Sequence, residues 1–319
     1  RNILKGYIDG SEQGIWKTPI SIAVFGEPGT GKSFAVKELA KGLFKAGEKP
    51  TFIECNVAQF ESPKNISDVM TKVREENLNK KVPFVFFDEF DCSYGSKDLG
   101  WLKYFLAPMH DGTFRGENND TLSVGRAIFV FAGGTAPSFD VFRQPELRAG
   151  SSRVSNKASR ASIKADFERV KGPDFVSRLR GHINIQSLNA APGQTKPLIS
   201  RAIIMHSQFK RLGLVTPAQN GMAAYARVDR DLVFAVLTAD KFNHGVRSIQ
   251  AIFEMCVQAR GAITKSSLPA RRQLEMHVNP AELYARMYRS AKRRKDSGAQ
   301  IAYDWERLKE KKLKKKNRK

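Results

Sequence analysis

Residues 26–33 read GEPGTGKS and match the pattern G-x-x-x-x-G-K-[ST], with Gly26, Gly31, Lys32 and Ser33 in the specified places. The apolar run at 20–25 predicts a buried strand directly before this stretch. An amphipathic helix is predicted after it, from apolar residues at helical spacing and a glycine suited to a C-cap: Val36, Leu39, Ala40, Leu43, Phe44 and Gly47. A strand, a glycine loop and a helix in this order predict a phosphate-binding loop, whereas an ordinary glycine turn would not require both flanking elements.

The chemistry of such a loop assigns a role to each of its parts. Its backbone N–H groups wrap the phosphates above the positive end of the helix dipole. Lys32 is expected to reach the β- and γ-phosphates, and the Ser33 hydroxyl is expected to coordinate Mg²⁺. We therefore expect ATP and Mg²⁺ to bind at the loop and at one further carboxylate, that is at Gly26, Glu27, Pro28, Gly29, Thr30, Gly31, Lys32, Ser33, Phe34 and Asp88.

Residues 83–91 read PFVFFDEFD and predict a second buried strand that ends in Asp88. A carboxylate there can help to hold Mg²⁺, as the Walker B aspartate does, and Glu89 can accept a proton from the attacking water. The alternative for Glu89 and Asp91 is a polar loop after a buried strand. Between the two motifs the sequence has room for a strand at 51–56 and a helix at about 65–78, which predicts a parallel sheet with helical crossovers.

The order of the later motifs resembles that of the AAA+ ATPases, and most nearly the Clp-type unfoldases. DLGWLKYFLAPMHDGTF at 98–114 predicts a helix and an Asp-Gly turn, and RAIFVFAGGT at 126–135 predicts a strand with a polar tip. GPDFVSRLRGHINI at 172–185 resembles the stretch that carries the arginine finger of the family. HGVRSIQAIFEMC at 244–256 resembles the sensor 2 motif of the lid domain.

This resemblance implies roles for individual residues. Thr135 takes the sensor 1 place, where Asn is commoner, Arg178 takes the arginine finger place with Arg180 as its competitor, and Arg247 takes the sensor 2 place. Each arginine also has an ordinary interpretation as a surface residue, Arg178 at the start of a strand and Arg247 at a helix N-terminus.

The family further implies a homo-oligomeric ring, often of six subunits, with loops that grip a polymer in the central channel. The first such loop corresponds to VAQFESPKNI at 57–66, where Phe60 is either the gripping residue or a buried side chain. The stretch at 115–120 would be a hairpin tip that lines the channel.

Composition sets the outer limits. With 319 residues, 41% of them hydrophobic, the chain is long enough for two cores, and it has no apolar window of about 18 residues that would span a membrane. Three scattered cysteines predict reduced thiols in a cytoplasmic protein, and the five histidines show no metal-binding spacing. The start at Arg1, without Met or a signal-peptide pattern, is compatible with a fragment whose missing N-terminal part carries a recognition domain.

Two segments depart from this pattern. The Ser-, Lys- and Arg-rich stretch at 150–164 predicts a surface insertion ahead of the helix that leads to Arg178. Residues 286–319 hold 15 Lys and Arg against four Asp and Glu, and this net +11 is half of the chain's +22. Either this tail is a solvated helix, or it contacts nucleic acid or an acidic partner.

We therefore expect an α/β parallel-sheet P-loop domain at 1–190, a small helical lid at 195–265 and a basic helical extension at 266–319. The leading hypothesis is an oligomeric AAA+ ATPase that remodels or unfolds protein substrates. The alternatives are an ATPase that translocates or loads nucleic acid, and an ATP-dependent assembly switch in a signalling or defence complex.

Overall fold

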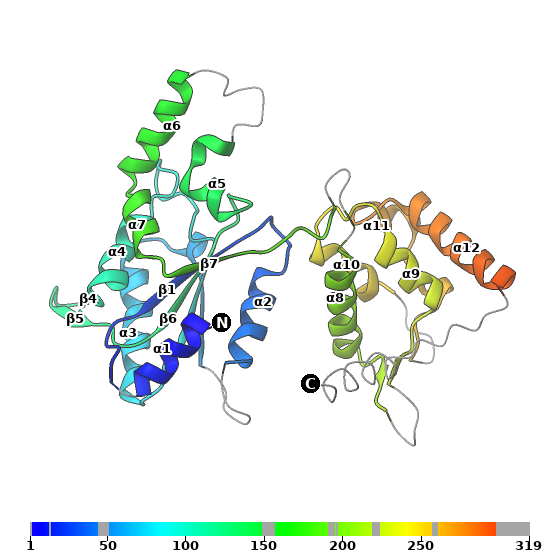
Figure 1. Cartoon of the computed structure of the whole chain (residues 1–319), viewed down its shortest axis with the longest axis horizontal. Helices are drawn as coiled ribbons and strands as arrows, with labels where there is room; N and C mark the ends of the chain where they lie inside the picture. The colour runs from blue at the N-terminus through cyan, green and yellow to red at the C-terminus, as the bar shows by residue number, and fades with distance from the viewer. Residues whose placement is uncertain are drawn as a thin grey trace, which may run out of the picture. The chain divides into compact units, whose positions relative to one another are not determined.

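The computed structural model describes residues 2–12, 14–43, 51–148, 157–190, 195, 197–218, 224–256 and 261–297. The chain divides into two compact units, Arg1–Gln186 and Ser187–Lys319. Figure 1 shows a sheet with helices in the first unit and a mainly helical second unit. Each unit is described by itself.

Five parallel strands form the central sheet of the first unit, in the order β2-β3-β6-β1-β7. Their bounds are β1 Ile20–Phe25, β2 Phe52–Asn56, β3 Phe84–Asp88, β6 Ile128–Ala132 and β7 Gly181–Asn184. The central strands are continuous apolar runs because both faces of the sheet are covered. Side chains alternate between two cores, so that Phe87 and Phe131 enter one core while Phe86 and Val130 enter the other. The predicted α/β parallel-sheet fold is confirmed.

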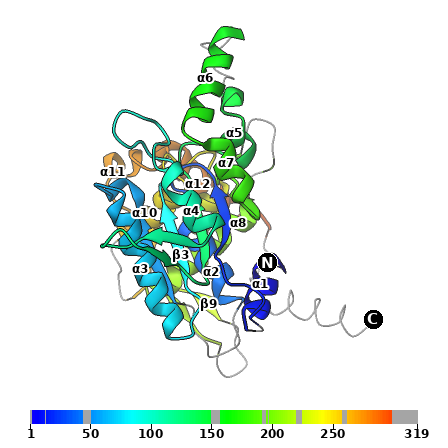
Figure 2. The ribbon, with the colours of Figure 1, turned by 90° about the vertical axis from the view of Figure 1, so that its left-hand side faces the viewer.

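Helices cover both faces of this sheet (Figure 1), and Figure 2 shows the unit from the side of α3 and α4. One core takes residues from α1 Asn2–Glu12 and α2 Lys32–Lys41. The other core takes residues from α3 Lys64–Leu78, α4 Leu102–His110, α5 Phe139–Arg143, α6 Lys157–Arg169 and α7 Gly172–Arg178. The Tyr7 hydroxyl fixes α1 to the sheet, since it donates to the Thr18 carbonyl at 2.8 Å and accepts from the Ala127 N–H at 3.1 Å.

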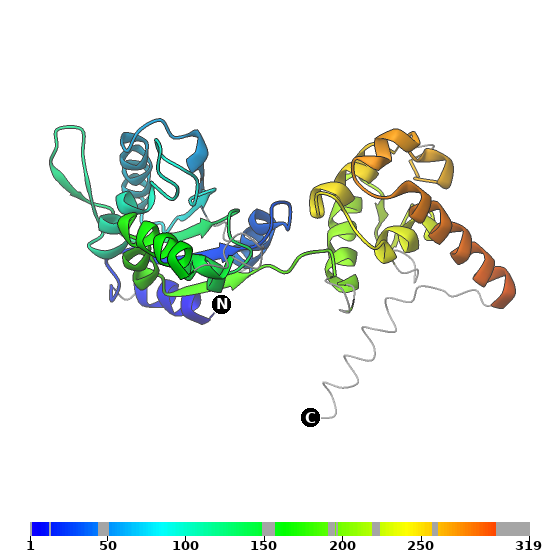
Figure 3. The same ribbon diagram turned by 90° about the horizontal axis from the view of Figure 1, so that it is seen from above.

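The described connections include a hairpin in the first unit and three short 3₁₀ turns. The strands β4 Thr113–Arg115 and β5 Thr121–Ser123 pair antiparallel after the Asp-Gly turn, and residues 116–120 form the tip between them (Figure 3). The 3₁₀ turns are η1 Val57–Gln59, η2 Pro145–Arg148 and, in the second unit, η3 Lys265–Ser267.

The expected surface insertion at 150–164 is partly wrong, because α6 already begins at Lys157. The physical reason lies downstream: Ile163, Phe167 and Val170 recur at helical spacing, and the buried Phe167 ring packs edge-on against Phe142 at 5.7 Å. Residues 149–156 lie outside the described residues. The predicted C-cap at Gly47 is wrong, because α2 ends at Lys41 and its C-cap is Gly42.

The second unit packs helices around a core of its own. Its elements are α8 Leu198–Arg211, β8 Val215–Thr216, β9 Tyr225–Ala226, α9 Arg230–Thr238, α10 Val246–Glu254, α11 Arg271–Glu275 and α12 Pro280–Ser297. The fully buried Arg201 donates to the carbonyls of Leu188, Leu237 and Ala239, and this ties the start of the unit to the end of α9.

The core of the second unit does not end at residue 265. Leu274, Val278, Leu283 and Met287 also belong to it, so α11 and the first turns of α12 are packed elements rather than an extension. The rest of the basic tail, 298–319, lies outside the described residues. In the described part of the chain, no helix has both the length and the apolar character needed to cross a membrane.

Candidate functional site

The predicted site residues of the first unit meet at the carboxyl edge of the sheet. Asp88 at the end of β3 lies in register with Ala132 of β6, and Ala132 lies in register with Val24 of β1. Gly26 follows β1 directly, so the glycine loop and Asp88 leave the same edge with only β6 between them. Two strand spacings correspond to about 10 Å, which is space enough for a phosphate group and a water molecule between them.

Two glycines of the loop have positions that no other residue fits well. A Cβ atom at Gly26 would lie 2.9 Å from the Ile185 carbonyl oxygen and 2.9 Å from the Thr30 hydroxyl. Gly31, the N-cap residue of α2, has a left-handed backbone with φ of 86°. The loop therefore passes close under β7 and turns sharply into α2, which directs the helix N-terminus at the loop.

Lys32 lies along the glycine loop. Its ammonium donates hydrogen bonds to the carbonyl oxygens of Gly26 at 2.9 Å and Glu27 at 3.3 Å, and the Thr30 hydroxyl donates to the same Glu27 oxygen at 2.8 Å. This arrangement places a positive charge at the mouth of the loop beside the first turn of α2, whose leading N–H groups have no partner within a helix. Among the other expected loop residues, Gly29 and Ser33 are half-buried, whereas Glu27, Pro28 and Phe34 are exposed.

Glu89 occupies a strained turn directly after β3. Its φ of 54° lies in the left-handed region, which costs a residue with a side chain about 1–2 kcal/mol. The turn is held at both ends, because the Glu89 N–H donates to the Asp88 carboxylate at 3.1 Å and the Cys92 N–H donates to the Glu89 carbonyl at 3.0 Å. The Glu89 side chain is exposed at the sheet edge, where it is accessible to a water molecule.

Asp91 supports this site from below the surface, although the sequence indicated no role for it beyond a polar loop. Its side chain is buried, and its carboxylate accepts hydrogen bonds from the Gly134 N–H at 3.1 Å, the Thr135 N–H at 2.8 Å and the Thr135 hydroxyl at 2.5 Å. Because the Thr135 hydroxyl donates its one proton to Asp91, it can only accept from a water molecule and cannot donate to a γ-phosphate. The only sequence signal for Asp91 is its place two residues after Glu89.

Arg178 is the last residue of α7 and does not start a strand. Its guanidinium donates to the Asp174 carbonyl at 2.6 Å and lies 3.8 Å from the Asp174 carboxylate, so these partners are on α7 itself. Its Nε is buried and lacks a hydrogen-bond partner among the described residues. The competitor Arg180 is exposed, and its backbone N–H donates to the Ser21 carbonyl at 2.8 Å.

Aromatic packing links α7 to the loops of the site. Phe90, next to Glu89, stacks on Phe175 of α7 with ring centroids 5.3 Å apart, and it contacts Phe25, next to Gly26, at 6.2 Å. The glycine loop, the Glu89 turn and the helix that carries Arg178 therefore share one rigid apolar base.

The two remaining predicted residues lie elsewhere. Arg247 is an exposed residue of the second unit, at the start of α10. Phe60 is half-buried and packs edge-on against the Trp101 ring at 5.8 Å, so its ring belongs to the core of the first unit.

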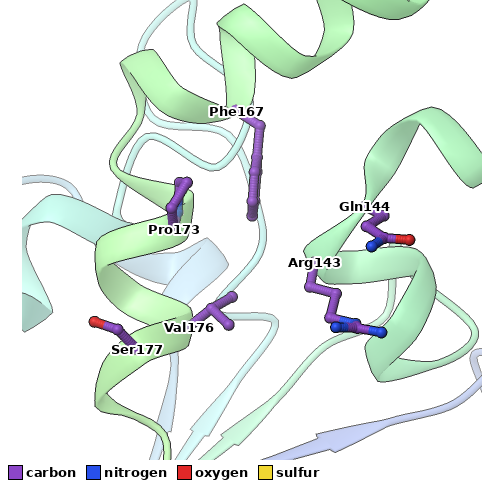
Figure 4. Close-up of a pocket in the computed structure, with 6 residues that line it drawn as sticks. All are labelled: Arg143, Gln144, Phe167, Pro173, Val176 and Ser177. Atoms are coloured by element: carbon purple, nitrogen blue, oxygen red, sulfur yellow. The ribbon is translucent and has the colours of Figure 1, made fainter.

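A shallow pocket of about 280 Å³ lies on the outer helices of the first unit (Figure 4). Residues of α5, α6 and α7, with Gln144 next to α5, line it: Arg143, Gln144, Phe167, Pro173, Val176 and Ser177. None of the predicted nucleotide-binding residues is among them, so this pocket is separate from the sheet edge.

Comparison with known proteins gives one family match. The model of the "ATPase family associated with various cellular activities (AAA)" matches residues 22–132, a range that includes the glycine loop and the Glu89 turn. No curated protein matches the chain. Among solved structures, the Hsp104–ADP complex of S. cerevisiae matches with a TM-score of 0.39 and 14% identity, over 65% of this chain and 35% of that chain.

Proposed function

We propose that this chain, whose residues 22–132 match the AAA ATPase family model, binds and hydrolyses ATP in a ring of identical subunits to remodel or unfold other proteins, as Clp-type unfoldases do. The observation that carries this proposal is the meeting of the glycine loop and the Glu89 turn at one edge of the sheet. We include a cytoplasmic, reducing location in the proposal, since all three cysteines are free thiols.

The binding step follows from the charges and donors at the loop. Lys32 would exchange its two carbonyl partners for β- and γ-phosphate oxygens, and the first turn of α2 would donate its N–H groups to them. The Ser33 hydroxyl and the Asp88 carboxylate are hard oxygen donors of the kind that Mg²⁺ prefers, and Mg²⁺ sites commonly use one or two protein ligands with phosphates and waters. When bound, Mg²⁺ would neutralise charge on the transferred phosphate.

The hydrolytic step would use residues that follow β3 and β6. Glu89 would accept a proton from the attacking water, and the Thr135 oxygen would orient that water by accepting its other proton. Arg178 would complete the site of a neighbouring subunit, with Arg180 as the competitor, and Arg247 would act on bound nucleotide from the lid. A guanidinium in that role is worth about 10³–10⁵ in rate.

Two substitutions test the assignment of the site. Lys32→Ala should abolish binding of a fluorescent ATP analogue, whereas Glu89→Gln should keep the binding and lose phosphate release, because only Glu89 acts on the water. Lys37→Ala is a matched control, since Lys37 is a lysine of the same helix that pairs with Glu54 at 2.8 Å. Equal binding and equal turnover in all three variants would contradict the proposal.

The choice of activator separates the hypotheses. Unfolded protein should stimulate the ATPase of a remodelling enzyme, nucleic acid should stimulate a translocating one, and an assembly switch should respond to neither. Electron microscopy of Glu89→Gln with ATP should trap the ring together with any threaded polymer. Stimulation by nucleic acid alone would replace the leading hypothesis.

A nucleic-acid partner is the second candidate, and α12 supplies the observation in its favour. Tyr284 and Tyr288, four residues apart on this helix, are 41% and 73% exposed, and the basic residues of the tail follow them. Exposed aromatic rings stack on bases, while Lys and Arg bind phosphates and make the affinity depend on salt.

The test of this second candidate must leave the helical core intact. A chain ending at 285 would lose the buried Met287, so the truncation should follow Ser297. Tyr288→Ala should weaken binding of single-stranded oligonucleotides, and the truncation should flatten the salt dependence. Tyr225→Ala, which removes another exposed tyrosine of the same unit, should change neither. An acidic protein as the only ligand would exclude the nucleic-acid role.

A further inference from the structure

The helix α6 projects from the first unit, as Figures 1 and 2 both show. Among its side chains from 160 to 169, Phe167 is buried and Ile163 is half-buried, and the others are exposed. Short helices are marginal in water, and in proteins most of their stability comes from the packing of an apolar face. The outer turns of α6 therefore present a surface that a partner could cover.

The outer half of α6 is basic. Residues 157–164 include Lys157, Arg160 and Lys164 and no acidic residue, so the first turn of the helix lacks a carboxylate that would offset its dipole. Lys164 lies 3.9 Å from the Glu168 carboxylate, but both side chains are more than half exposed and such a pair contributes little. Positive charge at the N-terminal end of a helix is unfavourable, and an anionic partner would offset it.

The shallow pocket of Figure 4 lies at the inner end of this basic surface. Arg160, Lys164 and Phe167 follow one another at spacings of four and three residues, so they share one face of α6. Arg160 stands about 10 Å from Phe167 along the helix axis. Phe167 lines the pocket together with Pro173 and Val176 of α7, so an apolar hollow and two exposed cations form one continuous surface.

The size and lining of the pocket decide which kind of anion fits. At about 280 Å³ it is at the lower limit for a small-molecule site, but it has room for one apolar side chain. A nucleic acid would need an exposed aromatic face for its bases. The aromatic residue of the lining, Phe167, is 6% exposed and packs edge-on against Phe142. A polypeptide, by contrast, supplies an apolar side chain and carboxylates together.

We propose that the pocket and the basic outer half of α6 form a docking surface for an acidic peptide segment of a partner protein. One apolar side chain of the segment fills the pocket, and its carboxylates pair with Lys164 and Arg160. An extended peptide advances about 3.3 Å per residue, so a carboxylate about three residues from the anchor reaches Arg160. The surface is separate from the sheet edge that carries the nucleotide-binding residues, and this inference goes beyond the proposed function.

Fluorescence anisotropy of a labelled synthetic peptide tests the surface in the full chain, without nucleotide. The probe has one leucine at its centre and four glutamates on each side. Replacement of its leucine by glycine should weaken binding about tenfold, because the pocket loses its apolar contact. Replacement of its glutamates by glutamines should also weaken binding about tenfold and remove the dependence of the affinity on salt.

Reversal of the charges on α6 should have a specific effect. Arg160→Glu combined with Lys164→Glu should lower the affinity for the probe by more than about tenfold. Lys72→Glu combined with Arg74→Glu is the matched control, since both residues are exposed on α3 and the net charge of the chain changes by the same amount. The control should change the affinity by less than about twofold at about 0.15 M salt.

Ser177→Leu tests the pocket itself, because Ser177 lines it and a leucine there would fill it. This variant should also lower the affinity about tenfold. Thr71→Leu on α3 is the control, since Thr71 and Ser177 are both exposed and each hydroxyl donates to a carbonyl one turn earlier in its helix. In the parent chain, the probe should slow amide hydrogen exchange in α6 and α7 but not in α3.

Several outcomes would overturn the proposal: a parent chain that does not bind the probe, equal losses of affinity in the α6 and α3 charge reversals, or parental affinity in Ser177→Leu. A single-stranded oligonucleotide that displaces the probe and protects α6 more strongly would make the surface a nucleic-acid site instead. An α6 reversal that dissociates an oligomer in sedimentation, with probe binding unchanged, would assign the surface to a second copy of the chain. If Ser177→Leu does not fold, the charge reversals and the glycine probe decide. A chain without ATPase activity would refute the proposed function and leave this docking surface standing.

Discussion

Replacing Asp91 with Asn is expected to lower the free energy of unfolding of the first unit by about 2–4 kcal/mol. The buried carboxylate accepts three hydrogen bonds from Gly134 and Thr135 at 2.5–3.1 Å. Asn has a single acceptor oxygen, so its NH₂ group must face at least one backbone N–H donor. A hydrogen bond to a charged group contributes about 1.5–3 kcal/mol, and a buried donor left without a partner costs about 1–3 kcal/mol. The Thr135 hydroxyl recovers part of this loss because it can rotate to accept from the new amide.

Urea unfolding followed by the fluorescence of the buried Trp101 measures this change, since Trp101 reports on the same unit. Asp98→Asn is the control, because Asp98 is exposed and accepts one bond from the Ser93 hydroxyl at 2.7 Å. Asp91→Asn should also lower kcat, since the Glu89 turn and the tip of β6 lose the link that the Asp91 carboxylate provides. An unfolding free energy for Asp91→Asn no lower than that of Asp98→Asn would refute the assigned role of the carboxylate.

The remaining predictions concern assembly, thiols and pH. Arg178→Ala should bind ATP without hydrolysing it, and mixing it with Glu89→Gln should restore part of the ATPase activity at interfaces between the two variants. If the two variants are shown to assemble together and no activity returns, Arg178 does not act on the site of a neighbouring subunit. Burial raises the pKa of all three cysteine thiols to about 11. Only about 0.1% of each thiol is therefore thiolate at pH 8, and alkylation should be far slower in the folded protein than in urea. Equal alkylation rates in the two conditions would contradict the burial of the thiols. Partial burial also lowers the pKa of His206 and of His277, with help from the charge of Lys210 in the first case and of His244 in the second. The unfolded chain therefore binds protons at higher pH than the folded chain, and the stability of the second unit should be complete above pH 6.5 and fall as the pH drops below it. Replacement of both histidines by Gln should flatten this fall, and an unchanged slope would exclude them as its source.

Features that depend on neighbouring residues were predictable from the sequence. The glycine loop, the strand before it and the helix after it lie within 22 residues, from Ile20 to Lys41. The Asp111-Gly112 turn, which ends α4 ahead of the hairpin, was also predictable, and Gly112 there has a φ of 64°. In each of these cases the preferences of a few adjacent residues dictate the backbone, because the hydrogen bonds involved are local.

Other features depend on contacts between segments that are far apart, and the sequence pattern did not reveal them. The insertion of β6 between β1 and β3 decides how far Lys32 lies from Glu89, and strand order is not written in any single strand. The buried Asp91 looked like a loop residue because its partners, Gly134 and Thr135, lie more than 40 positions away.

The sequence of this protein by itself determined the parallel α/β class, the glycine loop between β1 and α2, and the position of Asp88 and Glu89 at the end of β3, because these follow from local hydrogen bonding and from apolar periodicity. Only the tertiary structure decided that Phe60 packs on Trp101, that Thr135 gives its proton to Asp91, and that the second core continues through Met287. Burial is the physical reason, since whether a polar or aromatic side chain is exposed depends on which distant surface covers it.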